Sequence, residues 1–166
     1  MKSLSPSECS AWLKREGCCE NPYGGKEFSP ASYIQFAISK AEGGVSQTVD
    51  CIRTLLGSPR TCLFQVTDWS RYAEHENSRL IDLESKTSGD PFDAWGMVFD
   101  ASEVDEMFEC CFRVVKCGMS AYLYVPRIAT VYFWEGDLVD VWTNGPAMRD
   151  RLAQWLGSEQ LRITSS

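Results

Sequence analysis

The stretch AYLYVPRIATVYFWEGDLVDVW, residues 121–142, decides the fold of this chain. Its apolar and aromatic residues fall into three short runs with the alternation of half-buried strands. The runs lie near residues 121–125, 128–134 and 138–142. Only two or three residues connect them, and a parallel pair needs a crossover of about a dozen residues or more. The stretch therefore predicts a three-stranded antiparallel meander.

The N-terminus carries a helix-start signal. Ser5 can cap the helix, and Pro6 suits its first position. Glu8 stands three residues after the cap, as a capping box requires. Gly17 is the first residue that suits the left-handed conformation at which helices commonly end. We therefore expect a helix from Pro6 to about Glu16.

Further helices and strands are predicted from the spacing of apolar residues. Helical spacing occurs at residues 45–56, 102–117 and 146–156. Strand alternation occurs at residues 33–38, 61–67 and 94–99. The helix at residues 102–117 has the clearest apolar stripe, which consists of Val104, Met107, Phe108, Cys111 and Val115.

These elements predict an α+β fold. We expect one domain spanning residues 1–166, with a single, mainly antiparallel sheet, a C-terminal three-strand meander and about four helices packed on the sheet. Residues 68–93 form an acidic, irregular segment within that domain. Leu80, Ile81 and Leu83 suggest one short strand or turn inside it.

The composition is that of a globular protein with an excess of negative charge. Hydrophobic residues make up 44% and charged residues 23%, which excludes disordered and fibrous classes. Acidic residues outnumber basic ones 23 to 16, for a net charge of −7. The basic residues are scattered, so we expect no nucleic-acid partner. We also expect a cytoplasmic location and no membrane contact, because the chain has neither a run of about 20 apolar residues nor a secretion signal.

The eight cysteines are expected to be reduced thiols. Two pairs are adjacent, Cys18-Cys19 and Cys110-Cys111, and this spacing does not suit the CxxC turns of structural zinc sites. Without a secretion signal, thiols packed as small apolar side chains are the favoured interpretation. No metal and no other cofactor is predicted.

His75 is the only histidine, and it stands between Glu74 and Glu76. Carboxylates beside an imidazole make these three residues a candidate acid–base group, and hence the chain a candidate small enzyme of unknown class. However, neighbours in sequence on a helix or strand point in different directions. No second histidine completes an HExxH motif. A solvated histidine on a charged surface is the favoured interpretation.

The favoured function is non-enzymatic binding of a basic protein. Carboxylates of the acidic segment would steer the partner, and aromatic rings would anchor it. The candidate partner-binding residues are Trp69, Tyr72, Glu74, Glu76, Asp82, Glu84 and Phe92. The alternative for Trp69 and Phe92 is that they fill the core beneath a long loop. In composition, though in no motif, the chain is similar to bacterial immunity proteins, which neutralise basic toxins.

Overall fold

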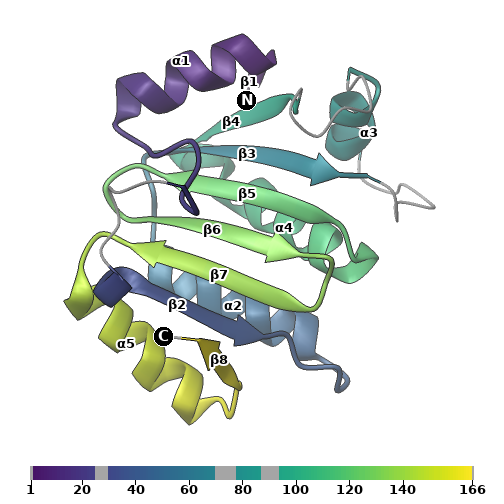
Figure 1. The fold of residues 1–166 in the computed structure, drawn as a ribbon. Helices are drawn as coiled ribbons and strands as arrows, with labels where there is room; N and C mark the ends of the chain where they lie inside the picture. Colours follow the sequence, from purple (N-terminus) through teal and green to yellow (C-terminus); the bar gives the residue numbers. More distant parts are fainter. Residues whose placement is uncertain (1, 25–29, 70–77, 87–93, 166) are drawn as a thin grey trace.

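The computed structural model of the protein describes residues 2–24, 30–69, 78–86 and 94–165 (Figure 1). The strands are β1 (Lys2–Leu4), β2 (Tyr33–Ala37), β3 (Thr61–Asp68), β4 (Gly96–Asp100), β5 (Ser120–Val125), β6 (Ala129–Trp134), β7 (Leu138–Thr143) and β8 (Ile163–Ser165). The α-helices are α1 (Pro6–Glu16), α2 (Gly44–Leu56), α3 (Ser78–Glu84), α4 (Val104–Cys117) and α5 (Pro146–Ser158).

The strands form one eight-stranded sheet in the order β1-β4-β3-β5-β6-β7-β2-β8. Every neighbouring pair is antiparallel. The predicted α+β class and the β5-β6-β7 meander are therefore confirmed. Strand β2 comes from early in the chain, yet it lies beside β7 and extends the meander by one strand.

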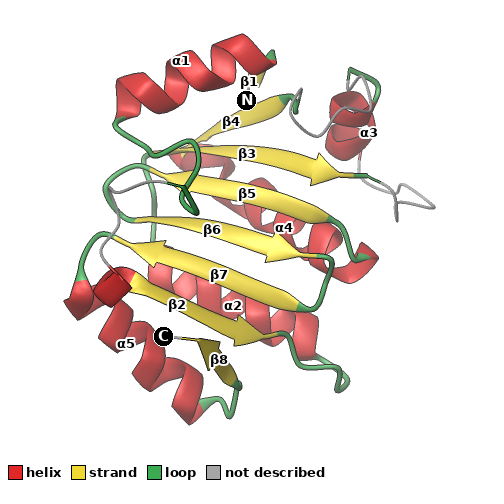
Figure 2. Ribbon diagram, in the orientation of Figure 1, coloured by secondary structure: helices red, strands yellow, loops and turns green. Residues whose placement is uncertain are grey.

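The first face of the sheet carries the main hydrophobic core. Val139 and Val141 of β7, together with Phe133 of β6, point into this core and are fully buried. Helices α2 and α4 lie behind the sheet in Figure 2 and supply much of the other side of the core. Helix α5 adds Leu152 and Leu156. The first face is therefore covered.

The second face is covered at one end by α1, which lies along the β1–β4 end of the sheet (Figure 2). Cys9, Trp12 and Leu13 of α1 pack on Leu63 of β3 and Tyr124 of β5. The contact is close because β4 has a glycine beneath the helix. A Cβ atom on Gly96 would lie 2.7 Å from the Cys9 sulfur and 2.7 Å from a methyl carbon of Leu63.

The predicted ends of α1 are confirmed. Glu8 accepts a hydrogen bond of 2.9 Å from the backbone N–H of Ser5, as a capping box requires. Gly17 ends the helix in the left-handed conformation, with φ of 69°. The capping residues thus fix where the chain leaves the helix and begins to cross the second face.

One predicted element was wrong. Leu80, Ile81 and Leu83 belong to helix α3 rather than to a strand or turn. Leu80 and Leu83 are fully buried in the main core, whereas Ile81 is 43% exposed. Residues three apart share one side of a helix, so this burial pattern follows from helical geometry. None of the helices in the described ranges is long and apolar enough to cross a membrane.

Candidate functional site

The part of the second face beyond α1 is lined by aromatic side chains. Because side chains alternate along a strand, residues opposite the main core on β5, β6, β7 and β2 share this surface. One row across the four strands consists of Tyr122, Tyr132, Asp140 and Gln35, each opposite the next in the register. A parallel row consists of Tyr124, Thr130, Trp142 and Tyr33. No described helix packs on this surface beyond Tyr124.

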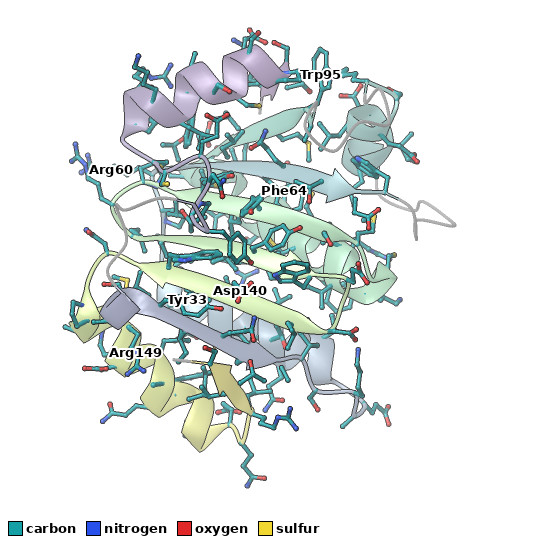
Figure 3. The ribbon with its side chains drawn as sticks, in the orientation of Figure 1. Tyr33, Arg60, Phe64, Trp95, Asp140 and Arg149 are labelled. Carbon is teal, nitrogen blue, oxygen red and sulfur yellow. The ribbon has the colours of Figure 1, made fainter. Side chains whose placement is uncertain are left out.

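We call this surface the aromatic face. It comprises Tyr23, Tyr33, Gln35, Tyr122, Tyr132, Trp134, Asp140 and Trp142. Figure 3 shows Tyr33 and Asp140 close together on the neighbouring strands β2 and β7. Six of the eight side chains are aromatic, and they come from four strands and from the loop that follows α1.

Asp140 lies at the centre of the aromatic face and is fully buried. Its Oδ1 accepts hydrogen bonds from the Tyr33 hydroxyl at 2.6 Å and from Gln35 Nε2 at 2.8 Å. Its Oδ2 accepts from the Tyr23 hydroxyl and from Trp134 Nε1. All four donors are neutral groups. Within the described part of the chain, no lysine or arginine forms an ion pair with this carboxylate.

Tyr23 reaches Asp140 from a turn rather than from a strand. The turn spans residues 21–24 and is closed by a hydrogen bond of 3.2 Å from Gly24 N to Asn21 O. Pro22 stands at its second position, where a fixed φ suits such turns. The turn presents the Tyr23 ring, which is 51% exposed, to the sheet.

The Tyr23 ring meets three other rings edge-on. Its centroid lies 4.7 Å from that of Trp142 and 6.2 Å from those of Tyr132 and Trp134. The Tyr23 hydroxyl also accepts a hydrogen bond of 2.8 Å from Trp134 Nε1. Edge-to-face contacts of this kind are favourable because the positive edge of one ring meets the negative face of another.

The remaining rings support one another across the strands. Tyr122 and Tyr132 are stacked with centroids 4.1 Å apart, and Tyr122 also stacks on Tyr124 at 5.3 Å. Tyr33 lies against Trp142 at 5.5 Å. These contacts, together with the hydrogen bonds to Asp140, hold the rings in a fixed arrangement.

Burial and the Asp140 carboxylate keep the phenols protonated. Burial raises the pKa of Tyr23, and its hydrogen bond to Asp140 raises that pKa further. The pKa of Tyr33 is raised by the same two causes in the same order. Burial also raises the pKa of Tyr122, with Tyr132 and Asp140 adding to the effect. The hydroxyls of Tyr23 and Tyr33 therefore remain donors to the carboxylate at neutral pH.

The aromatic face is suited to binding rather than to proton transfer. A general base needs a free lone pair within hydrogen-bond reach of its substrate, and four donors already occupy the two Asp140 oxygens. The described residues contain no group of three or more side chains suited to hold a metal ion. What this surface offers a ligand is a set of fixed rings around a buried negative charge.

A small cavity adjoins the aromatic face where the chain leaves α1. It has a volume of about 180 Å³ and lies between the loop after the helix and the turn that joins β5 to β6. Its lining includes Cys18, Cys19, Arg127, Thr130 and Trp142. Burial raises the pKa of Cys18 to about 11, with nearby Glu16 adding to the effect, so this thiol is a weak nucleophile at neutral pH.

The sequence-predicted site residues lie apart from the aromatic face or outside the described residues. Tyr72, Glu74, His75, Glu76 and Phe92 are outside the described residues, so the arrangement of the candidate acid–base group is not part of the structure. The partner-binding residues within the described ranges are Trp69, Asp82 and Glu84.

These three residues all belong to the acidic segment, residues 68–93. Trp69 is half-buried against the main core, in agreement with the alternative that it fills the core. Asp82 is exposed on α3, where it pairs with Lys86 at 2.7 Å. Glu84 is half-buried on the same helix. The ion pair lowers the pKa of Asp82, so this carboxylate is charged at neutral pH.

Asp140 and the rings around it were not predicted as a site. A signal was present in the sequence, because Asp140 interrupts the apolar run Leu138-Val139-Asp140-Val141-Trp142. A carboxylate in a strand that is apolar on both faces must have buried donors. What the sequence could not supply was the position of those donors, which come from segments far from β7.

Comparison of the chain with family models, curated proteins and solved structures finds no match.

Proposed function

We propose that this chain is a non-enzymatic protein-binding domain that recognises a basic protein partner through the aromatic face. The observation that carries the proposal is the gathering of six rings around one buried carboxylate, on a surface that no described helix covers beyond Tyr124. Neutralising a basic toxin, as immunity proteins do, is one role of this kind.

The choice of side chains supports protein binding. Tyrosine and tryptophan are enriched at the centres of protein interfaces, where they bury a large area and still offer a polar group. Rings that are already fixed lose little conformational freedom when a partner binds. Here the fixing groups are the hydrogen bonds to Asp140 and the stacked pair Tyr122–Tyr132.

The charge supports a basic partner. A net charge of −7 attracts a positively charged protein over a distance of several ångströms and speeds association. At short range, Asp140 adds a buried negative charge whose described donors are all neutral. Aromatic rings also bind cations through their negative faces. Both the long-range field and the local chemistry therefore favour cationic groups.

The acidic segment, residues 68–93, remains our second candidate surface. Its carboxylate Asp82 is exposed on α3, beside the β1 end of the sheet, where Asp82 lies 3.4 Å from the Ser3 hydroxyl. The aromatic face is preferred because its rings are held in place, whereas Asp82 is already paired with Lys86. The alternative of a small enzyme that uses His75, Glu74 and Glu76 is also a proposal, and it gains no support from Asp140.

Site-specific photocrosslinking in cells of the source organism tests which surface binds. A benzoylphenylalanine is placed at position 134 on the aromatic face, at position 82 on α3, or at position 106 on the outer side of α4. Glu106 is exposed and belongs to the opposite side of the sheet, so it serves as the control. We expect position 134 to capture one basic protein that positions 82 and 106 do not capture.

Two results would overturn the proposal. Capture of a protein from position 82 and not from position 134 would move the interface to the acidic segment. Capture of no protein from position 134, or of an acidic one, would remove the aromatic face as a surface for basic partners.

A further inference from the structure

We infer that Tyr23 occupies the place of a partner's arginine side chain, and that binding exchanges the Tyr23 phenol for a guanidinium group at Asp140. This inference rests on the proposed function and names the chemical group that the aromatic face recognises. Its basis is the combination of a half-exposed ring, a turn whose backbone forms no hydrogen bond with the described residues of the sheet, and a buried carboxylate whose described donors carry no charge.

The Tyr23 side chain can move away from the aromatic face while the strands of the sheet keep their pairing. Among the described residues, the turn at residues 21–24 has one backbone–backbone hydrogen bond, which joins Gly24 N to Asn21 O within the turn itself. The Tyr23 side chain, by contrast, makes the contacts with the sheet, through its ring and its hydroxyl. Rotation of one side chain, or a shift of one turn, therefore opens the position.

The position that Tyr23 fills is lined on several sides. Tyr132, Trp134 and Trp142 surround its ring edge-on, and Asp140 Oδ2 lies at its inner end. The outer side is open, since half of the Tyr23 surface is exposed. A flat group with a donor at its tip matches this shape, and Tyr23 itself is such a group.

Arginine matches the same shape and adds a charge. Its guanidinium is planar, stacks on aromatic rings and donates N–H groups to carboxylates. Tyr23 and arginine would both donate to an ionised acceptor, but only the guanidinium adds a positive charge and can donate two parallel N–H groups to a carboxylate. Exchange of the phenol for a guanidinium would also neutralise the buried charge of Asp140. Trp134 Nε1 would keep its own hydrogen bond to Oδ2 throughout.

Tyr23 therefore competes, as an internal group, with a partner's arginine for the position beside Asp140. When a site is filled by an internal group, the apparent dissociation constant for a ligand rises by the inverse of the fraction of time that the site is open. A tyrosine that closes the site about 90% of the time would weaken binding about tenfold. Removal of this side chain should then strengthen binding, although it also removes a contact residue.

Binding of N-acetyl-arginine amide to the purified protein tests the inference. The indole N–H signal of Trp134 in ¹⁵N–¹H spectra reports on the position directly. We expect Tyr23→Ala to bind the arginine derivative about tenfold more tightly than the unaltered protein does. N-acetyl-citrulline amide, which has nearly the same shape without the charge, should not bind to either. N-acetyl-lysine amide carries the same charge without a guanidinium group. It should bind more weakly than the arginine derivative if the site recognises the guanidinium and not merely a cation.

Two further variants serve as controls. Tyr23→Phe keeps the ring and loses the hydroxyl, so its affinity for arginine should lie between those of the unaltered protein and Tyr23→Ala. Adding Asp140→Asn to Tyr23→Ala should abolish binding, with the fold verified by circular dichroism and by the melting temperature. If Asp140→Asn disrupts the fold, the citrulline comparison still tests the role of charge in Tyr23→Ala.

The inference is overturned if Tyr23→Ala binds the arginine derivative no more tightly than the unaltered protein does, or if citrulline or lysine binds as well as arginine. The partner captured by crosslinking separates this failure from failure of the proposed function. If Trp134→Ala and Tyr23→Ala both weaken that partner's binding, Tyr23 is an ordinary contact and the aromatic face remains the interface. If neither variant changes the affinity, the proposed function itself fails.

Discussion

The hydroxyl of Tyr33 lies 2.6 Å from Oδ1 of Asp140, and the two residues are 107 positions apart in the sequence. Strand β2 brings them together by pairing with β7, so that Gln35 stands directly opposite Asp140. The pairing of β2 with β7 is what places these two distant side chains within hydrogen-bond reach of each other. The buried carboxylate thus links the assembly of the sheet to the assembly of the aromatic face.

Asp140→Asn should destabilise the protein by about 1–3 kcal/mol, the usual cost of a buried donor left without an acceptor. An asparagine side chain has one amide NH₂ where Asp140 has an accepting oxygen, so two of the four donors lose their acceptor. Urea unfolding measures the change. Asp137→Asn is the matched control, because Asp137 is exposed and its pair with Lys40 lies at the surface. Equal stability of the two variants would contradict the role given to Asp140.

Stability should fall as the pH rises above about 9. Burial raises the pKa of Cys9, Cys51 and Cys62 from 9.0 to about 12. The folded pKa is thus higher than the unfolded one, so the stabilisation is complete below pH 9 and is lost as the pH increases. The pKa values of Tyr23 and Tyr33 are raised as well, so these two phenols also reduce stability as the pH increases, in their case above a pH of about 10. Unfolding in urea at pH 7, 8, 9 and 10 tests this, and an increase in stability over that range would contradict it.

In Asp140→Asn the phenols of Tyr23 and Tyr33 should ionise at lower pH than in the unaltered protein. Burial is the larger cause of their raised pKa values and remains in the variant, but the hydrogen bond to a charged carboxylate is lost. Absorbance at the tyrosinate wavelength, followed during a pH titration, measures the shift. Identical titration curves would show that the carboxylate does not influence the phenols.

Gly96→Ala and Gly157→Ala should change stability in opposite directions. A Cβ atom at position 96 would overlap Cys9 and Leu63, and overpacking of this kind costs about 1–3 kcal/mol. A Cβ atom at position 157 meets nothing within 4 Å, and alanine is favoured over glycine in a helix by about 0.5–1 kcal/mol. Thermal or urea unfolding of both variants measures whether each substitution raises or lowers the stability. A stable Gly96→Ala would show that α1 does not pack closely on β4.

Alkylation of cysteines should separate the buried thiols from the rest. The structure has eight free thiols, of which Cys9, Cys51, Cys62, Cys110 and Cys111 are buried. We expect iodoacetamide to react with these five far more slowly in the native protein than after unfolding. All eight should react in the unfolded, unreduced protein, and mass spectrometry counts them. Fewer than eight would indicate a disulfide.

Much of the fold could be predicted from local patterns. Capping residues gave both ends of α1, and alternation gave the meander, because both signals are complete within a few neighbouring residues. The buried stripe of α4 was predicted for the same reason, and Met107, Phe108, Cys111 and Val115 are buried as expected. Helix α3 was not predicted because its seven residues are too few to show a helical period. The three-residue strands β1 and β8 are shorter still.

The candidate site could not be predicted, because it depends on which strands become neighbours. The sequence shows an aspartate inside an apolar strand, but its donors come from β2, β6 and the loop after α1. Tyr23 is the extreme case, since it lies 117 positions from Asp140 and belongs to no strand or helix. The acidic segment was predicted as the binding surface because of its negative charge. Charged residues indicate exposed surfaces, and they do not reveal a buried carboxylate.

The most direct test of the aromatic face is the affinity of the crosslinked partner, once purified, for Trp134→Ala and for Ile81→Ala. The two side chains are similarly exposed, at 39% and 43%, but Trp134 belongs to the aromatic face and Ile81 to α3 beside the acidic segment. We expect Trp134→Ala to weaken binding about 30-fold or more, as loss of an interface hot spot does, and Ile81→Ala to change it less than about twofold. An unchanged affinity in a correctly folded Trp134→Ala, or a larger loss in Ile81→Ala, would contradict the account.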